Sequence, residues 1–90
     1  MIIRFSRHAQ QRLALRKISK RKVEDIAQKS SDRFYDMETR HLIAVQSRSR
    51  AKAVIVAYQD ALDERWIITA HPMSRGQIAR RIQRGRWIKL

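Results

Sequence analysis

Histidine and arginine side chains flank one well-specified junction in this sequence, between an expected strand and an expected helix. His71 ends an apolar stretch that begins at Arg65, and Arg75 follows Ser74 at the start of the helix. Unpaired backbone N–H groups and the helix dipole favour an anion such as phosphate at such a start. His71 and Arg75 are therefore candidates for an anion site, although a histidine at a strand end more commonly hydrogen-bonds a neighbouring turn.

A second histidine–arginine pair lies near the N-terminus. Ser6 can cap a helix over about residues 7–17, in which His8 and Arg12 are four residues apart and share one face. An imidazole titrates near neutral pH and suits proton transfer, whereas a guanidinium suits phosphate binding. The two pairs could act as one site only if the fold brings them together.

Local patterns predict the elements that position these residues. A second helix begins at Ser19 and ends near Ser30, and four strands follow at about 33–37, 41–47, 51–59 and 65–71. Pro72 is expected to stop the last strand. The connections are short, so the strands should form an antiparallel meander with 51–59 at its centre.

The last helix, about residues 75–84, is specified at both ends. Ser74 and Gln77 fit a capping box, and Gly85 fits the residue that follows the helix. Trp87 and Ile88 should then fold back as an apolar anchor. The fold class predicted is α+β, with two N-terminal helices packed on a four-stranded antiparallel sheet and followed by a C-terminal helix. The aromatic side chains expected in the core are Phe5, Phe34, Trp66 and Trp87.

Net charge is the strongest compositional feature. With 21 Lys and Arg against 8 Asp and Glu, the formal net charge of the 90 residues is +13, more than solubility requires. The 15 arginines outnumber the 6 lysines, and the guanidinium fork matches phosphate geometry. A single domain (residues 1–90) that binds a polyanion is expected, with RNA or DNA first and an acidic protein second.

Other classes of protein are disfavoured by composition. The chain has no cysteine, and its three histidines are not spaced as metal ligands, so we expect neither a metal nor a cofactor. The apolar runs are far too short to span a membrane, and the N-terminus lacks the apolar region of a signal peptide. A cytoplasmic protein without a membrane partner is predicted.

Several short motifs together resemble a known family. They are H-A-x-x-R (His8, Ala9, Arg12), R-K-I-S-x-x-x-V (16–23), I-T-A-H-P (68–72) and R-I-Q-R-G-R-W (81–87). In this order and spacing the chain resembles the RelE/BrnT-type toxins of toxin–antitoxin pairs, within the wider barnase, EndoU, colicin and RelE ribonuclease group. The resemblance implies a metal-independent RNA endonuclease, an mRNA interferase, that is neutralised by a cognate acidic antitoxin. Its RNA would be mRNA, free or on the ribosome.

Such cleavage needs a base for the ribose 2′-hydroxyl, an acid for the leaving oxygen and cations for the phosphorane. In this hypothesis His8 and His71 are base and acid, Arg12 and Arg75 hold the phosphate, and Tyr58 orients it or stacks on a base. The catalytic candidates are thus His8, Arg12, His71 and Tyr58. The RNA-binding candidates are Arg48, Arg50, Arg75, Arg80, Arg81, Arg84 and Arg86.

Structural roles for the same residues stay open at this point. In these structural alternatives His8 covers the sheet edge, and Arg12 pairs with an acid such as Glu38. Tyr58 is then a core residue with its hydroxyl at the rim of the core. Arg48, Arg50 and Arg75 compete with the histidines for the catalytic role. A non-catalytic RNA- or ribosome-binding module is the alternative function, and a protein-interaction role is the third. Convergence of the histidines and arginines in one concavity would favour catalysis, and dispersal would favour binding.

Overall fold

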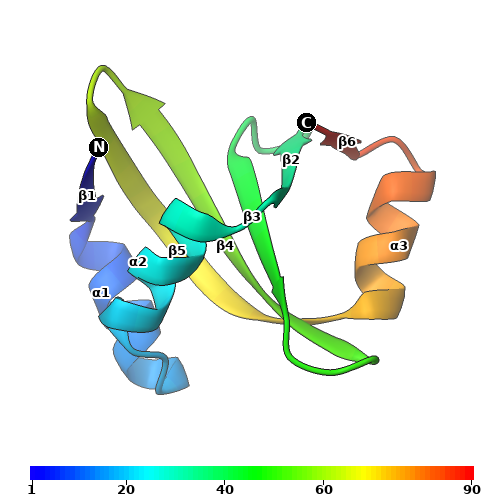
Figure 1. The fold of residues 1–90 in the computed structure, drawn as a ribbon, viewed down its shortest axis with the longest axis horizontal. Coiled ribbons are helices and arrows are strands. Elements are labelled where there is room, and N and C mark those ends of the chain that lie inside the picture. The colour runs from blue at the N-terminus through cyan, green and yellow to red at the C-terminus, as the bar shows by residue number, and fades with distance from the viewer.

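The computed structural model describes all residues 1–90, and Figure 1 shows the path of the chain. The elements are β1 (Ile2–Phe5), α1 (Arg7–Arg16), α2 (Lys20–Lys29), β2 (Asp32–Asp36), β3 (Leu42–Ser47), β4 (Lys52–Ala61), β5 (Glu64–Ser74), α3 (Arg75–Gln83) and β6 (Trp87–Lys89). The α+β class and the three expected helices are present. None of these helices is long and apolar enough to cross a membrane.

The six strands form one mixed sheet in the order β1-β5-β4-β3-β2-β6. The predicted sheet of four antiparallel strands is therefore wrong. The meander from β2 to β5 is antiparallel as expected, but β1 lies parallel to β5 at one edge and β6 lies antiparallel to β2 at the other. The two added strands have only 4 and 3 residues. Segments this short carry too little alternation to be recognised as strands.

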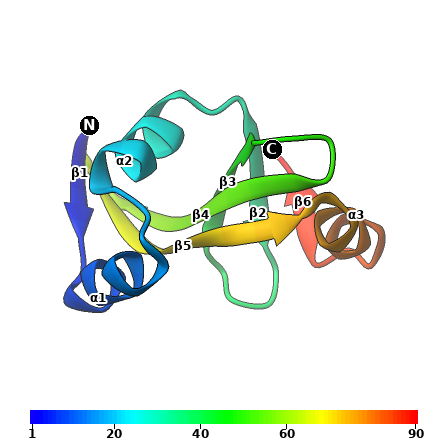
Figure 2. The same ribbon diagram turned by 90° about the horizontal axis from the view of Figure 1, so that it is seen from below.

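Two apolar cores cover the two faces of the sheet. One contains Leu13 of α1 and Ile26 of α2, and the other contains Ile78 of α3 and Trp87 of β6. Figures 1 and 2 show α1 and α2 at one end of the molecule and α3 at the other. Residues 53–58 of β4 are all buried, which confirms β4 as the central strand.

The predicted helix starts are confirmed. The hydroxyl oxygens of Ser6, Ser19 and Ser74 each accept a backbone N–H of the first helical turn, at 3.0 to 3.1 Å. The Gln77 side chain accepts the backbone N–H of Ser74 at 3.2 Å, which completes the capping box. Gly85 has φ 74°, in the left-handed region that glycine adopts without strain. These local interactions fix which side chains of α3 point outward.

Pro72 does not end the strand as predicted, because β5 continues to Ser74. β1 pairs only with residues 64–67 of β5, so β5 has an open edge at Pro72. A residue without an N–H is tolerated on such an edge.

A register shift between Ala57 and Tyr58 of β4 explains a second error. It displaces the alternation of β5, so that Ile67 and Ala70 are buried while Trp66, predicted to be in the core, is 38% exposed. Trp87 is buried as expected, but Ile88 is 46% exposed. Only Trp87 therefore acts as the predicted apolar anchor.

Candidate nucleic-acid interface

Four arginines gather around the C-terminal end of α3. Ile78 faces the core, which leaves Arg80 and Arg81 on the rest of the helix surface, and Arg84 caps the helix. The turn at Gly85 then directs the chain back toward β2 and adds Arg86. We call Arg80, Arg81, Arg84 and Arg86 the arginine cluster.

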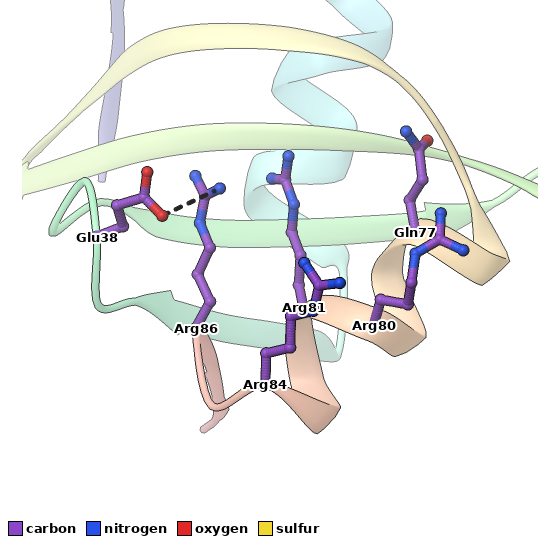
Figure 3. Close-up of a pocket in the computed structure, with 6 residues that line it drawn as sticks. All are labelled: Glu38, Gln77, Arg80, Arg81, Arg84 and Arg86. Carbon is purple, nitrogen blue, oxygen red and sulfur yellow. Dashed lines mark ion pairs between the residues drawn. The ribbon is translucent and has the colours of Figure 1, made fainter.

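The arginine cluster lines a pocket of about 480 Å³ together with Gln77 and Glu38 (Figure 3). None of the lining residues is hydrophobic. Glu38 comes from the turn between β2 and β3 (residues 37–41), so the pocket lies between that turn and α3. Its volume falls in the range of small-ligand sites, but its lining suits a charged polar group.

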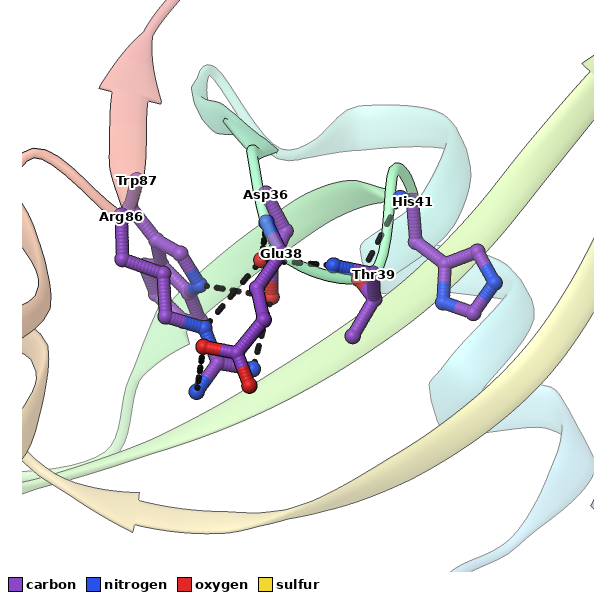
Figure 4. Close-up of polar contacts among 6 residues, drawn as sticks. All are labelled: Asp36, Glu38, Thr39, His41, Arg86 and Trp87. Atoms are coloured by element: carbon purple, nitrogen blue, oxygen red, sulfur yellow. Dashed lines mark hydrogen bonds and ion pairs between the residues drawn. The ribbon is translucent and has the colours of Figure 1, made fainter.

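Asp36 at the end of β2 holds two of the lining residues in place through the polar contacts drawn in Figure 4. Its carboxylate is 2% exposed and accepts two hydrogen bonds from Arg86, both 3.1 Å. It also accepts the indole N–H of Trp87 at 3.1 Å and the backbone N–H groups of Glu38 at 2.9 Å and Thr39 at 3.2 Å. One buried acid thus holds the β2–β3 turn, Arg86 and β6 together.

The ionisation of Asp36 reflects these contacts. Burial alone would raise its pKa, but the hydrogen bonds from Arg86, Thr39, Glu38 and Trp87 lower the pKa to about 2. The hydrogen bond to Asp36 in turn raises the pKa of Arg86. This ion pair therefore stays charged throughout the physiological range, and it fixes the Arg86 guanidinium at the pocket.

Arg81 is in a different electrostatic state. Its guanidinium lies 5.3 Å from the centre of the Trp87 ring and forms no ion pair with an acid. Burial and the nearby charge of Arg86 lower the pKa of Arg81. A bound anion would relieve this repulsion between cations, and Arg81, like Arg80 and Arg84, has no acid partner, so all three can hold a phosphate.

The pocket carries a net positive charge, although the buried carboxylate of Asp36 pairs with Arg86. Glu38 is the only acid in the lining, and its side chain is 70% exposed and 3.4 Å from Arg86. A pair this exposed neutralises little of the surrounding charge. The arrangement can bind one or more phosphate groups, with the guanidiniums of Arg80, Arg81 and Arg84 as donors, because the nitrogens of Arg86 already contact Asp36 and Glu38.

The other predicted RNA-binding arginines lie outside this pocket. Arg75, at the start of α3, is 3.8 Å from the carboxylate of Asp32. Arg48 and Arg50 are exposed in the turn between β3 and β4 and form no ion pair. Of the seven predicted arginines, the structure therefore brings together four.

The four catalytic candidates do not share one pocket with the arginine cluster. His8 and Arg12 are exposed on α1, which lies at the opposite end of the molecule from α3 (Figure 1). His71 lies opposite Ile55 of the α3-side core, and its Nδ1 is 2.9 Å from the carbonyl oxygen of Pro72. His71 therefore lies within β5 and contacts the next residue of the same strand, so neither a strand end nor a bond to a neighbouring turn is found.

Tyr58 is a core residue, 2% exposed. Its hydroxyl accepts a hydrogen bond from Arg33 at 2.8 Å, and the guanidinium of Arg65 lies 4.4 Å from its ring centre. Asp60 holds Arg65 in place with two hydrogen bonds, 2.7 and 2.9 Å. The contacts of Tyr58 are those of a structural residue at the rim of the core.

Sequence reasoning missed Asp36 and Glu38. Two carboxylates so close together in a basic chain, one at the end of a strand and one in the turn that follows, are a usable indication of a specific contact. Their main partner, Arg86, is 50 residues from Asp36, and no local pattern links the two positions. The alternative in which Arg12 pairs with an acid such as Glu38 is not found, because α1 lies at the opposite end of the molecule from α3 and Glu38 contacts Arg86.

Comparisons with known proteins do not extend this description: no protein-family model, no curated protein and no solved structure matches the chain.

Proposed function

We propose that this protein binds RNA, with the phosphate backbone held by the arginine cluster. The observation that carries the proposal is the pocket of four guanidiniums with a single, largely exposed acid in its lining. The overall charge of +13 would attract any polyanion. The choice of RNA over DNA rests on the resemblance of the sequence to the ribonuclease toxins.

Binding should depend strongly on salt, because each phosphate contact releases counterions. For a single strand the slope of log K against log salt is about −0.7 per contact. We expect an affinity loss on the order of 10³-fold between low and moderately high salt. A flat salt response would contradict RNA binding as the explanation of the charge.

The cluster can be tested against the rest of the basic surface. Arg80→Glu/Arg84→Glu reverses two exposed charges in the pocket, and Arg7→Glu/Arg21→Glu makes the same change in charge on α1 and α2, where neither arginine forms an ion pair. Fluorescence anisotropy with a short labelled RNA should show at least about 10-fold weaker binding for the pocket variant than for its control, and a salt slope smaller by about 1.4. Equal losses would mean that binding is a general effect of charge.

RNA cleavage is a second candidate function, favoured by the carboxylate of Glu38 in the same pocket as the guanidiniums. In this proposal Glu38 takes the proton of the ribose 2′-hydroxyl as its oxygen attacks the phosphorus. The bond from phosphorus to the 5′-oxygen breaks to leave a 2′,3′-cyclic phosphate, and a solvent water protonates the 5′-oxygen. Arg81 stabilises the charge that develops on the phosphorane. Glu38→Gln should lower cleavage by roughly 10²- to 10⁴-fold while RNA binding persists. The assay uses purified protein with a chelator present, and a substrate with 2′-O-methyl groups should resist cleavage. Cleavage of that substrate would contradict attack by the 2′-hydroxyl.

Toxicity and control by an acidic antitoxin follow from the same proposal. Induced expression in a bacterial host, with growth and mRNA integrity followed, tests toxicity directly. An acidic partner would cover the arginine cluster, because the free surface would otherwise bind RNA throughout the cell. Titrating such a partner into a preformed RNA complex should displace the RNA, and a stable ternary complex would contradict a shared surface.

A further inference from the structure

A second pocket, different in character, lies on the other side of the β2–β3 turn. It has a volume of about 390 Å³, and hydrophobic residues make up five of the eight that line it. Its aromatic and aliphatic members include Tyr35, Leu42 and Trp66, and its one cation is Arg40. We call it the aromatic pocket. It differs from the arginine cluster in that flat apolar surface dominates.

The pocket exists because the β4–β5 hairpin extends beyond β3. β3 starts at Leu42, opposite Tyr58, whereas β4 continues to Ala61 and pairs there only with β5. Residues 59–61 of β4 therefore present a backbone edge without a strand partner, and all three line the pocket. Free N–H and C=O groups beside an apolar surface can hydrogen-bond the edge of a planar ligand.

Trp66 is the aromatic side chain available to such a ligand. It is 38% exposed, in contrast to Trp87 at 1% and Tyr58 at 2%. The face of the Tyr58 ring is already occupied by the guanidinium of Arg65. The indole of Trp66 lines the pocket and is partly open to solvent, so it offers a platform for stacking.

One rigid turn separates the two pockets. Glu38 lines the arginine cluster's pocket and Arg40 lines the aromatic pocket, so their Cα atoms are at most about 7 Å apart. The turn is held by backbone hydrogen bonds from Arg40 N–H to Asp36 at 2.7 Å and from Met37 N–H to Arg86 at 2.8 Å. A bound chain that crosses the turn would reach both pockets within a few monomer units.

We propose that the aromatic pocket takes one unpaired nucleobase of the RNA strand whose phosphates lie in the arginine cluster. This inference rests on the proposed function. A nucleobase has the π-face that Trp66 can stack on and the polar edge that residues 59–61 can pair with. In a duplex the π-face of a base is stacked and its polar edge is paired, so neither can contact the pocket. The proposed ligand is therefore single-stranded.

The test compares two oligonucleotides with the same number of phosphates, one with bases and one entirely abasic. Wild-type protein should bind the oligonucleotide with bases roughly 5- to 100-fold more tightly than the abasic one, which is the ratio of affinities expected from the stacking of one base. Trp66→Ala should bind both equally, at the abasic level, and Trp66→Phe should restore most of the preference. Thermal unfolding of both variants checks that the domain is intact.

Tryptophan emission gives a second readout. The indole of Trp66 should be quenched when the base-containing oligonucleotide binds, and the quench should be absent in Trp66→Phe although binding persists. Equal affinity of wild type for both oligonucleotides would overturn the base pocket and leave the phosphate site intact. Failure of both oligonucleotides to bind would overturn the proposed function itself. Loss of a protein partner in Trp66→Ala, with RNA affinity unchanged, would assign the pocket to protein recognition and overturn the inference.

Discussion

Asp36→Asn is the most informative single change for the architecture of the arginine pocket. Asparagine has the same shape as aspartate but places an NH₂ group, a donor, where the carboxylate accepts hydrogen bonds. Because Asp36 is 2% and Trp87 1% exposed, the indole N–H of Trp87 cannot turn to water without disturbing β6. Removing one partner of a buried, hydrogen-bonded charge pair costs about 3 to 5 kcal/mol. We expect a loss at the lower end of this range, because the Arg86 side chain is 27% exposed.

The dependence of stability on pH gives a second, independent value for the contribution of Asp36 to the free energy of unfolding. The pKa of Asp36 is lowered from 3.8 to about 2, and each unit corresponds to about 1.4 kcal/mol. Its ionised form therefore contributes roughly 2 kcal/mol to folding. A lowered pKa in the folded state means that this contribution is complete above about pH 4 and is lost as the pH falls through 2. The stability difference between wild type and Asp36→Asn should shrink over the same window.

Urea unfolding of both proteins at several pH values between 7 and 2 measures this difference directly. Asp63→Asn is the matched control, since Asp63 is exposed and its side chain forms no hydrogen bond or ion pair, and its unfolding curve should superimpose on that of wild type. A difference between wild type and Asp36→Asn that stays constant down to pH 2 would refute the assignment of Asp36 as a buried, ionised anchor.

Three further predictions concern other elements. Tyr58→Phe removes the hydroxyl that accepts a bond from Arg33 and should cost about 1 kcal/mol in urea unfolding without changing RNA affinity. Ser74→Ala removes the N-cap of α3 and should cost about 1 kcal/mol, and no loss in thermal unfolding would contradict the capping box. His8→Ala/His71→Ala should keep any RNA cleavage activity within about threefold, whereas a loss of 10²-fold or more would return the acid and base roles to the histidines.

Local sequence patterns predicted the helices and the meander well. The N-caps at Ser6, Ser19 and Ser74 involve groups only three residues apart, so the sequence contains the whole interaction. The continuous apolar run of β4 likewise predicts that both faces of this strand are buried, as they are over residues 53–58. The same reasoning predicted that three side chains of the last helix point away from the core, those of Arg80, Arg81 and Arg84. All three line the pocket.

Features made by distant segments were not predictable in this way. β1 becomes a strand only because β5 offers a parallel edge, and β6 only because β2 offers an antiparallel one. The shift at Ala57 and Tyr58 moves Trp66 outward, although its alternation in sequence resembles that of a core residue. The Asp36–Arg86 pair forms only when β6 has joined the sheet beside β2. No local pattern in the sequence predicts a contact between residues this far apart.

The two outer strands also determine the order in which the molecule can assemble. β1 is tied to β5 through the pair Arg4–Glu64, 60 residues apart, and β6 to β2 through Arg86–Asp36, 50 residues apart. Contacts that close such long loops form late, after the hairpins between them. The meander should therefore fold first, and amide hydrogens of β1 and β6 should exchange fastest among the strands. Since Arg86 reaches its place only with β6, we expect the pocket of the arginine cluster to form late in folding and to open early.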